Sequence, residues 1–116
     1  MTRRVVHLEV PAQDADRAQE FYAALLGWEM QNVMPEYDYR MADLGEGQGA
    51  AVYPAEDRGL RVYFGVDDID ADVARTRELG GQADDKQAVP GIGWFSGCTD
   101  PEGNRFFLWQ QDQSAG

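Results

Sequence analysis

The fold of this chain is decided by two stretches, residues 4–10 (RVVHLEV) and residues 61–66 (RVYFGV). In both, apolar residues alternate with other residues, a period of two that predicts half-buried strands. His7 and Arg61 are 54 positions apart, and the offset of 54 also superimposes the segments that follow each stretch. We therefore expect an internal repeat, in which one structural motif occurs twice.

Each strand is followed by a segment with helical spacing of apolar residues. The first covers residues 15–26 and ends at Gly27, and the second covers about residues 70–79 and ends at residues 80–81. Glycine is typical just beyond a helix, where it adopts a left-handed conformation. Each helix is expected to begin at an aspartate that caps free backbone N–H groups. The candidates are Asp14 or Asp16 and Asp67 or Asp68.

Each helix is followed by a predicted hairpin, over residues 37–53 and residues 94–110. The sequence thus predicts an α+β protein of two βαβββ modules, about residues 4–57 and 58–111, with a flexible tail at residues 112–116. Neither module alone would easily bury its sheet face, so we expect them to share a core as a single domain spanning residues 1–116.

Composition excludes several classes of function. The chain has 116 residues, with 10 Lys and Arg against 21 Asp and Glu, a formal net charge of −11. A surface this acidic repels phosphate backbones and anionic lipids, so we expect neither nucleic acid nor a membrane as partner. Cys98 is the single cysteine and cannot form an internal disulfide. With neither a signal-peptide pattern nor a long apolar run, the default expectation is a cytoplasmic protein.

Several short motifs carry a family resemblance. They are residues 6–10 (VHLEV), 63–69 (YFGVDDI), 79–81 (LGG) and 100–104 (DPEGN). Through these motifs the chain, up to Gln111, resembles the vicinal oxygen chelate superfamily. This is the group of glyoxalase I, extradiol dioxygenases, fosfomycin-modifying enzymes and bleomycin-resistance proteins. The resemblance implies that the two modules pair into a cup-shaped mixed sheet with helices on the outside. It also implies a homodimer.

The metal enzymes of this superfamily take one ligand from the first strand and one from the last strand of each module. Carried over to this sequence, the first-strand positions are His7 and Arg61, and the last-strand positions fall at Val52 or Tyr53 and at Phe107. His7 is a competent ligand, but an arginine cannot coordinate a metal, valine and phenylalanine have no donor atom, and a tyrosine would be an unusual ligand. With three of four positions lost, we expect no metal cofactor.

We expect instead that the concave face binds a small organic molecule, aromatic or anionic. The expected contacts are His7, Tyr53, Arg61, Tyr63, Trp94, Phe107 and Trp109, with Tyr37, Tyr39 and either Trp94 or Phe95 as candidates from neighbouring strands. Such a face would be neutral to cationic. The alternatives are an aromatic core, or a dimerisation module with an occluded cup.

An enzyme is the second functional hypothesis. His7 would act as a general base in lyase- or isomerase-like chemistry and Arg61 would stabilise the oxyanion that develops, or a degenerate metal site would remain. Glu9 lies two residues from His7, hence on the same strand face. It is expected either to be solvated at the strand edge or to raise the pKa of His7.

Overall fold

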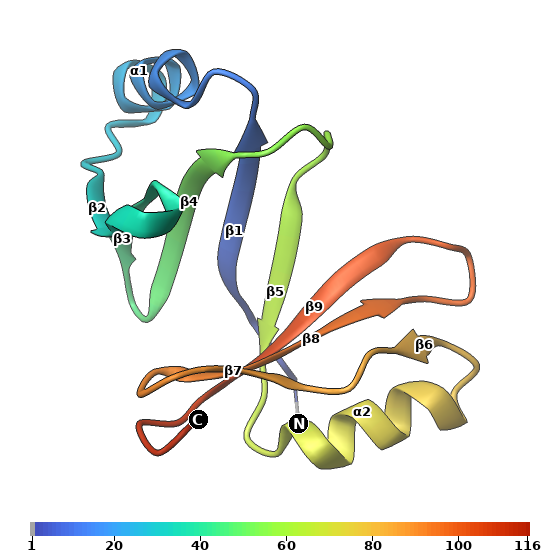
Figure 1. The fold of residues 1–116 in the computed structure, drawn as a ribbon. Helices are drawn as coiled ribbons and strands as arrows, with labels where there is room; N and C mark the ends of the chain where they lie inside the picture. Colours follow the sequence, from blue (N-terminus) through green and yellow to red (C-terminus); the bar gives the residue numbers. More distant parts are fainter. Residues whose placement is uncertain (1) are drawn as a thin grey trace. The chain divides into compact units, whose positions relative to one another are not determined.

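The structure is a computed structural model that describes residues 2–116 (Figure 1). Its elements, in chain order, are β1 (Val5–Ala12), α1 (Ala15–Leu26), β2 (Gln31–Met34), the short 3-10 helix η1 (Pro35–Tyr37), β3 (Tyr39–Gly45), β4 (Gln48–Pro54), β5 (Arg61–Gly65), α2 (Ile69–Glu78), β6 (Gln82–Ala83), β7 (Gln87–Val89), β8 (Gly93–Thr99) and β9 (Arg105–Gln111).

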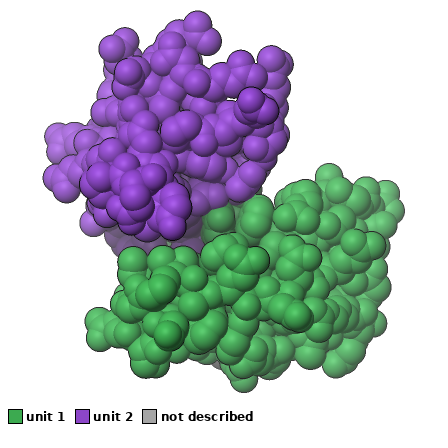
Figure 2. Space-filling view, in the orientation of Figure 1, with its two compact units in different colours: residues 1–5, 62–116 green, residues 6–61 purple. Residues whose placement is uncertain are grey.

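The chain divides into two compact units (Figure 2). The first is Val6–Arg61, and the second is Val62–Gly116 together with the segment before Val6. In the first unit β1 pairs in parallel with β4, β4 pairs antiparallel with β3, and β3 pairs antiparallel with β2. In the second, β5 pairs in parallel with β9, β9 pairs antiparallel with β8, and β8 pairs antiparallel with both β6 and β7.

The same order of pairing therefore occurs in both units. In the second unit the two short strands β6 and β7 both pair with β8, whereas in the first unit the single strand β2 pairs with β3. The strand that corresponds to β2 is therefore interrupted in the second unit. The α+β class and the two βαβββ modules expected from the sequence are confirmed.

Both helices begin at an aspartate. The side chain of Asp14 accepts a hydrogen bond of 3.0 Å from the backbone N–H of Arg17, and that of Asp68 accepts one of 3.2 Å from Ala71. Of the two candidates for each helix, the structure thus selects the residue directly before the first helical position. Gly27, with φ of 72°, ends α1 in the left-handed conformation.

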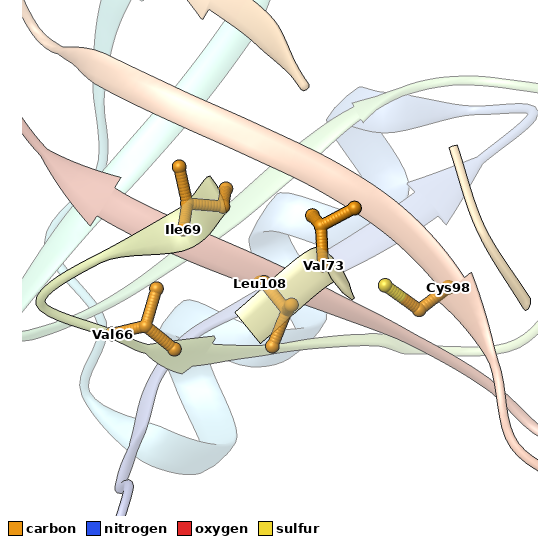
Figure 3. Packing of buried hydrophobic residues seen from close by; sticks show 5 residues of the cluster. All are labelled: Val66, Ile69, Val73, Cys98 and Leu108. Carbon is orange, nitrogen blue, oxygen red and sulfur yellow. The ribbon is translucent and has the colours of Figure 1, made fainter. Parts of the chain in front are cut away.

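Each unit has its own hydrophobic core between its helix and its sheet. In the first unit Val10 of β1 and Val52 of β4 pack with Ala15 of α1, flanked by Tyr22 and Trp28. In the second unit the core is formed by Val66, Ile69, Val73, Cys98 and Leu108 (Figure 3). Full burial of an aliphatic side chain of this size contributes roughly 1.5–3 kcal/mol. The thiol of Cys98 is part of this core, since Cys98 is 1% exposed.

The C-terminal residues 112–116, for which the sequence predicts a flexible tail, make hydrogen bonds to the loop before β8 and among themselves. The backbone N–H of Gly91 donates a 2.9 Å hydrogen bond to the carbonyl oxygen of Ala115, and Ala115 is buried. Asp112 also accepts hydrogen bonds from Ser114. The bond between Gly91 and Ala115 joins the C-terminal segment to the loop before β8. Among residues 2–116, no helix has the length and apolarity needed to cross a membrane.

Candidate functional site

One face of the first unit's sheet carries a group of polar and aromatic side chains. Val10 and Val52 face α1, so the alternating residues of β1 and β4 point to the other side. His7 and Glu9 lie on that side, and so does Tyr53. In β3, the side chain of Arg40 bonds to α1, which places its neighbour Tyr39 on the side of His7. We call this side the helix-free face of Val6–Arg61.

A hydrogen-bonded chain runs across the helix-free face. The hydroxyl Oη of Tyr39 lies 2.6 Å from Nε2 of His7 and 2.7 Å from Oε2 of Glu9. The rings of His7 and Tyr39 stack with centroids 6.2 Å apart and an interplanar angle of 24°. Residue 49, opposite His7 in β4, is a glycine, and a Cβ there would stand 3.1 Å from Nδ1 of His7. The missing side chain makes room for the imidazole.

Burial governs the protonation of His7. Desolvation lowers the pKa of His7 below its ordinary 6.5, and the negative charge of Glu9 opposes this only in part. The imidazole is therefore neutral at pH 7. The expectation that Glu9 is solvated at a strand edge is wrong, because Glu9 is only 9% exposed and its carboxylate is hydrogen-bonded to Tyr39. Its expected upward effect on the pKa of His7 exists but is outweighed by burial.

Tyr53 and Arg61 form a second group on the same face. The guanidinium carbon of Arg61 lies 5.5 Å from the centroid of the Tyr53 ring, a cation–π geometry. Arg61 also forms an ion pair with Asp57. The hydroxyl of Tyr53 is buried and has no hydrogen-bond partner within residues 2–116. Burial, reinforced by the charge of Glu9, raises the pKa of Tyr53 to about 12, so this hydroxyl stays protonated.

The electrostatic character of this face differs from the neutral-to-cationic one that the sequence suggested. Arg61 is matched by Asp57, and Glu9 adds a buried carboxylate beside a neutral His7. Sequence patterning did not reveal this because the pairing of Arg61 with a residue of the preceding loop depends on how that loop folds.

The remaining predicted contact residues lie on the second unit. The rings of Tyr63 and Phe107, which are register partners in β5 and β9, stack with centroids 4.7 Å apart. Trp109 shares their face of the sheet, where its indole covers Gly93. A Cβ at Gly93 would stand 2.5 Å from Cζ2 of that indole. Both Tyr63 and Phe107 are buried.

Trp94 lies on the opposite face from these three aromatic residues. It packs against the core beneath α2, its Nε1–H donates a 3.0 Å hydrogen bond to Asp112, and Nζ of Lys86 stands 4.4 Å from its ring centroid. The expectation that Trp94 joins the other aromatic residues is corrected accordingly. Phe95, the alternative to Trp94, is the register partner of Trp109 and shares its face. Strand parity distinguishes the two once the strand's register is known.

The donor set does not fit the metal that the family resemblance implies. His7 uses Nε2 in the bond to Tyr39, and Arg61 is a cation paired with Asp57. Phe107 has no donor atom, and the Tyr53 hydroxyl is protonated. Across the described part of the chain, no three His, Cys, Asp or Glu side chains are grouped so that they can hold a metal ion.

Tyr39 is the residue whose importance sequence reasoning missed. It was expected only as one more aromatic side chain, together with Tyr37, which is 68% exposed in η1. The alternation in β3 places Tyr39 and Met41 on one face. The register of β3 on β4, and of β4 on β1, brings that face beside His7, and no local pattern encodes this register.

Comparison with known proteins gives a coherent picture. The family model of the glyoxalase-like domain matches residues 5–109. The putative glyoxylase CFP32 of Mycobacterium tuberculosis is 29% identical over 112 residues, which cover 90% of this chain and 43% of that protein. The same protein of Mycobacterium bovis matches equally. The chain thus spans less than half the length of these curated relatives.

Solved structures share the fold. A glyoxalase/bleomycin resistance protein/dioxygenase superfamily member from Vibrio splendidus 12B01 has a TM-score of 0.72 at 20% identity, covering 95% of this chain and all of that one. Methylmalonyl-CoA epimerase from Mycobacterium tuberculosis has a TM-score of 0.69 at 18% identity, covering 93% of this chain and 87% of that one. At these identities the likeness concerns the fold alone.

Proposed function

The chain belongs to the glyoxalase-like domain family, and from this premise we propose that it is a metal-free member that binds a small organic molecule, aromatic or anionic, against the helix-free face of Val6–Arg61. The proposal departs from the family's metal chemistry because the donor set does not fit a metal. In place of a metal, aromatic rings, a hydrogen-bonded histidine and one arginine would contact the ligand.

The buried hydroxyl of Tyr53 is the observation that carries the proposal. A buried polar group without a partner costs about 1–3 kcal/mol. This hydroxyl has no hydrogen-bond partner within residues 2–116. Its ring lies 5.9 Å from that of Tyr39, centroid to centroid. A ligand with an aromatic ring and a polar atom would satisfy the hydroxyl and pack against the tyrosines.

An aromatic ring is favoured over a negative charge as the main recognition feature. Arg61 is the cation of this face, and it is paired with Asp57. An anion would have to displace or share that carboxylate, whereas an aromatic ring would not. Aromatic carboxylic acids present both features and are the first probes to use.

A thermal-shift titration tests the binding proposal. 4-Hydroxybenzoate, benzoate, pyruvate and methylmalonyl-CoA are the probes. A ligand at 100 times its Kd stabilises by about 2.7 kcal/mol, which raises the Tm of a domain of this size by roughly 10 °C. Tyr53→Phe should weaken the shift by an aromatic acid, while Tyr37→Phe, at an exposed tyrosine, should leave it unchanged. A flat response to every probe contradicts the proposal.

The neutral state of His7 favours a second candidate, an enzyme of the lyase or isomerase type. A neutral imidazole can take a proton from an acidic C–H bond, the electron pair moving to the adjacent carbonyl oxygen and the imidazole becoming an imidazolium. Arg61 would stabilise the resulting oxyanion once released from Asp57. The test is exchange of the acidic C–H of methylmalonyl-CoA in D2O, followed by proton NMR. Exchange that persists in His7→Gln would rule out this role.

We also propose that the protein forms a homodimer, as the family resemblance implies. Light scattering coupled to gel filtration should give about twice the chain mass of 12.9 kDa. A mass of one chain at micromolar concentration contradicts this.

A further inference from the structure

The charges around the hydroxyl of Tyr53 do not balance. Those that act on it are the carboxylates of Glu9 and Asp57 and the guanidinium of Arg61. His7, on the same face, is neutral because burial lowers its pKa. These groups together leave an excess of one negative charge. A molecule that brings a further negative charge to the Tyr53 hydroxyl is therefore repelled, whereas an uncharged molecule is not.

Asp57 supplies one of these negative charges and at the same time engages Arg61. Oδ2 of Asp57 accepts a hydrogen bond from Nη2 of Arg61, and the two side chains form an ion pair. This hydrogen bond holds the pKa of Asp57 below its ordinary 3.8, so the carboxylate is charged at pH 7. Asp57 thus takes a position on the guanidinium that suits the carboxylate of a ligand equally well.

The ion pair of Asp57 is one that a ligand can compete with. Asp57 lies in the loop 55–60 between β4 and β5, and its side chain is 59% exposed, against 33% for Arg61. An exposed ion pair is weak, equivalent to a factor of about five at most in an equilibrium constant. Because the loop tethers Asp57 four residues before Arg61, its carboxylate is present at every encounter with a ligand.

We propose that Asp57 sets the charge specificity of the site, because by engaging Arg61 it favours an uncharged aromatic carbonyl compound over an aromatic carboxylate. The inference rests on the proposed function and separates the aromatic from the anionic ligands named there. The hydroxyl of Tyr53 stays protonated, so it can donate to the carbonyl oxygen of an aromatic amide or ketone. Contact of a ligand ring with the ring of Tyr53 does not require Asp57 to leave Arg61.

Benzamide and benzoate test the inference, because they have nearly the same shape and differ in charge. Their Kd values are measured by amide chemical-shift titration of ¹⁵N-labelled protein at pH 7.5. The wild-type protein should bind benzamide more tightly than benzoate. Asp57→Asn should tighten the binding of benzoate by roughly fivefold and leave that of benzamide unchanged. A wild-type preference for benzoate, or a ratio of the two Kd values that Asp57→Asn does not change, overturns the proposal.

Two further variants separate competition for Arg61 from a general effect of charge. Glu56→Gln makes the same change of charge at the neighbouring exposed residue and should leave both Kd values as in the wild type. An equal gain for benzoate in Glu56→Gln contradicts a specific role of Asp57. In an Arg61→Gln background, Asp57→Asn should no longer tighten benzoate binding, since the guanidinium is gone. A gain of the same size there contradicts the competition.

A failure of the proposed function gives a different result from a failure of this inference. If neither compound shifts an amide resonance in the wild type or in Asp57→Asn, the proposed function is contradicted, and the role of Asp57 with it. If both compounds bind and their ratio of Kd values is the same in the two proteins, the proposed function stands and the role of Asp57 alone is contradicted.

Discussion

At the scale of single residues, the helix-free face owes its character to Glu9. A carboxylate that is 9% exposed must be hydrogen-bonded, and Tyr39 provides that bond. The hydroxyl of Tyr39 is also hydrogen-bonded to Nε2 of His7. The three side chains come from two strands, so each depends on the register that brings the strands together. A substitution of any one of them is expected to disturb the hydrogen bonds of the other two.

The lowered pKa of His7 predicts how stability varies with pH. In the unfolded chain His7 has its ordinary pKa of 6.5, and in the folded protein burial lowers it. As the pH falls through 6.5 the unfolded chain binds the proton first, so the free energy of unfolding should decrease below that pH. Urea unfolding at pH 7.5 and 5.5 measures this loss.

The chain offers a clean control for this effect. His7 is the single histidine, and the aspartates with lowered pKa values, such as Asp38 and Asp57, titrate below their ordinary 3.8. His7→Gln keeps a donor for Tyr39 but does not titrate, so its stability should be nearly constant between the two pH values. An equal loss in wild type and His7→Gln would contradict the assignment.

At the scale of elements, much of the fold was predictable because its signals are local. The helix limits followed from apolar spacing, from the capping aspartates and from Gly27. β2, β6 and β7 were not located, since two to four residues are too few to display an alternation. The face assigned to Trp94 was wrong for a related reason. Whether Trp94 or its neighbour Phe95 lies on the face of Trp109 depends on the register of β8.

The capping assignment has a measurable consequence for α1. Asp14 caps the helix through the N–H of Arg17, whereas Asp16 is highly exposed and pairs with the side chain of Arg40. Asp14→Ala should therefore lower the free energy of unfolding by about 1 kcal/mol. Asp16→Ala should cost about 0.5 kcal/mol or less. Chemical denaturation compares the two, and the reverse order would contradict the assignment.

Two glycines in the sheets predict a further contrast. A Cβ at Gly93 would clash with the carbonyl oxygen of Gln110, a backbone atom that cannot move without distorting β9. A Cβ at Gly49 meets the flexible end of Met41 at 3.0 Å and His7 at 3.1 Å. Gly93→Ala should thus cost about 3 kcal/mol or more and Gly49→Ala about 1 kcal/mol. Equal costs in denaturation experiments would show that the tight contact at Gly93 is absent.

At the scale of the whole molecule, most of the acidic residues are not part of the candidate site. The net charge of −11 is carried mainly by exposed aspartates and glutamates at helix starts and turns, while Glu9 is buried among the side chains of the site. The family resemblance could be recognised from the sequence because short motifs carry it. The pairing of Arg61 with Asp57 could not be recognised, because it depends on how the loop before β5 folds. The bridging role of Tyr39 could not, because it depends on the register that brings β3 beside β1.

We propose that the chain holds no metal, because Arg61 and Phe107 offer no donor for a metal and the hydroxyl of Tyr53 stays protonated. The most direct test is the metal content of protein produced in medium supplemented with Mn, Fe, Ni and Zn, purified without chelators and measured by inductively coupled plasma mass spectrometry. We expect far less than one equivalent of any of these metals per chain. One equivalent of a single metal, retained through gel filtration, would contradict it.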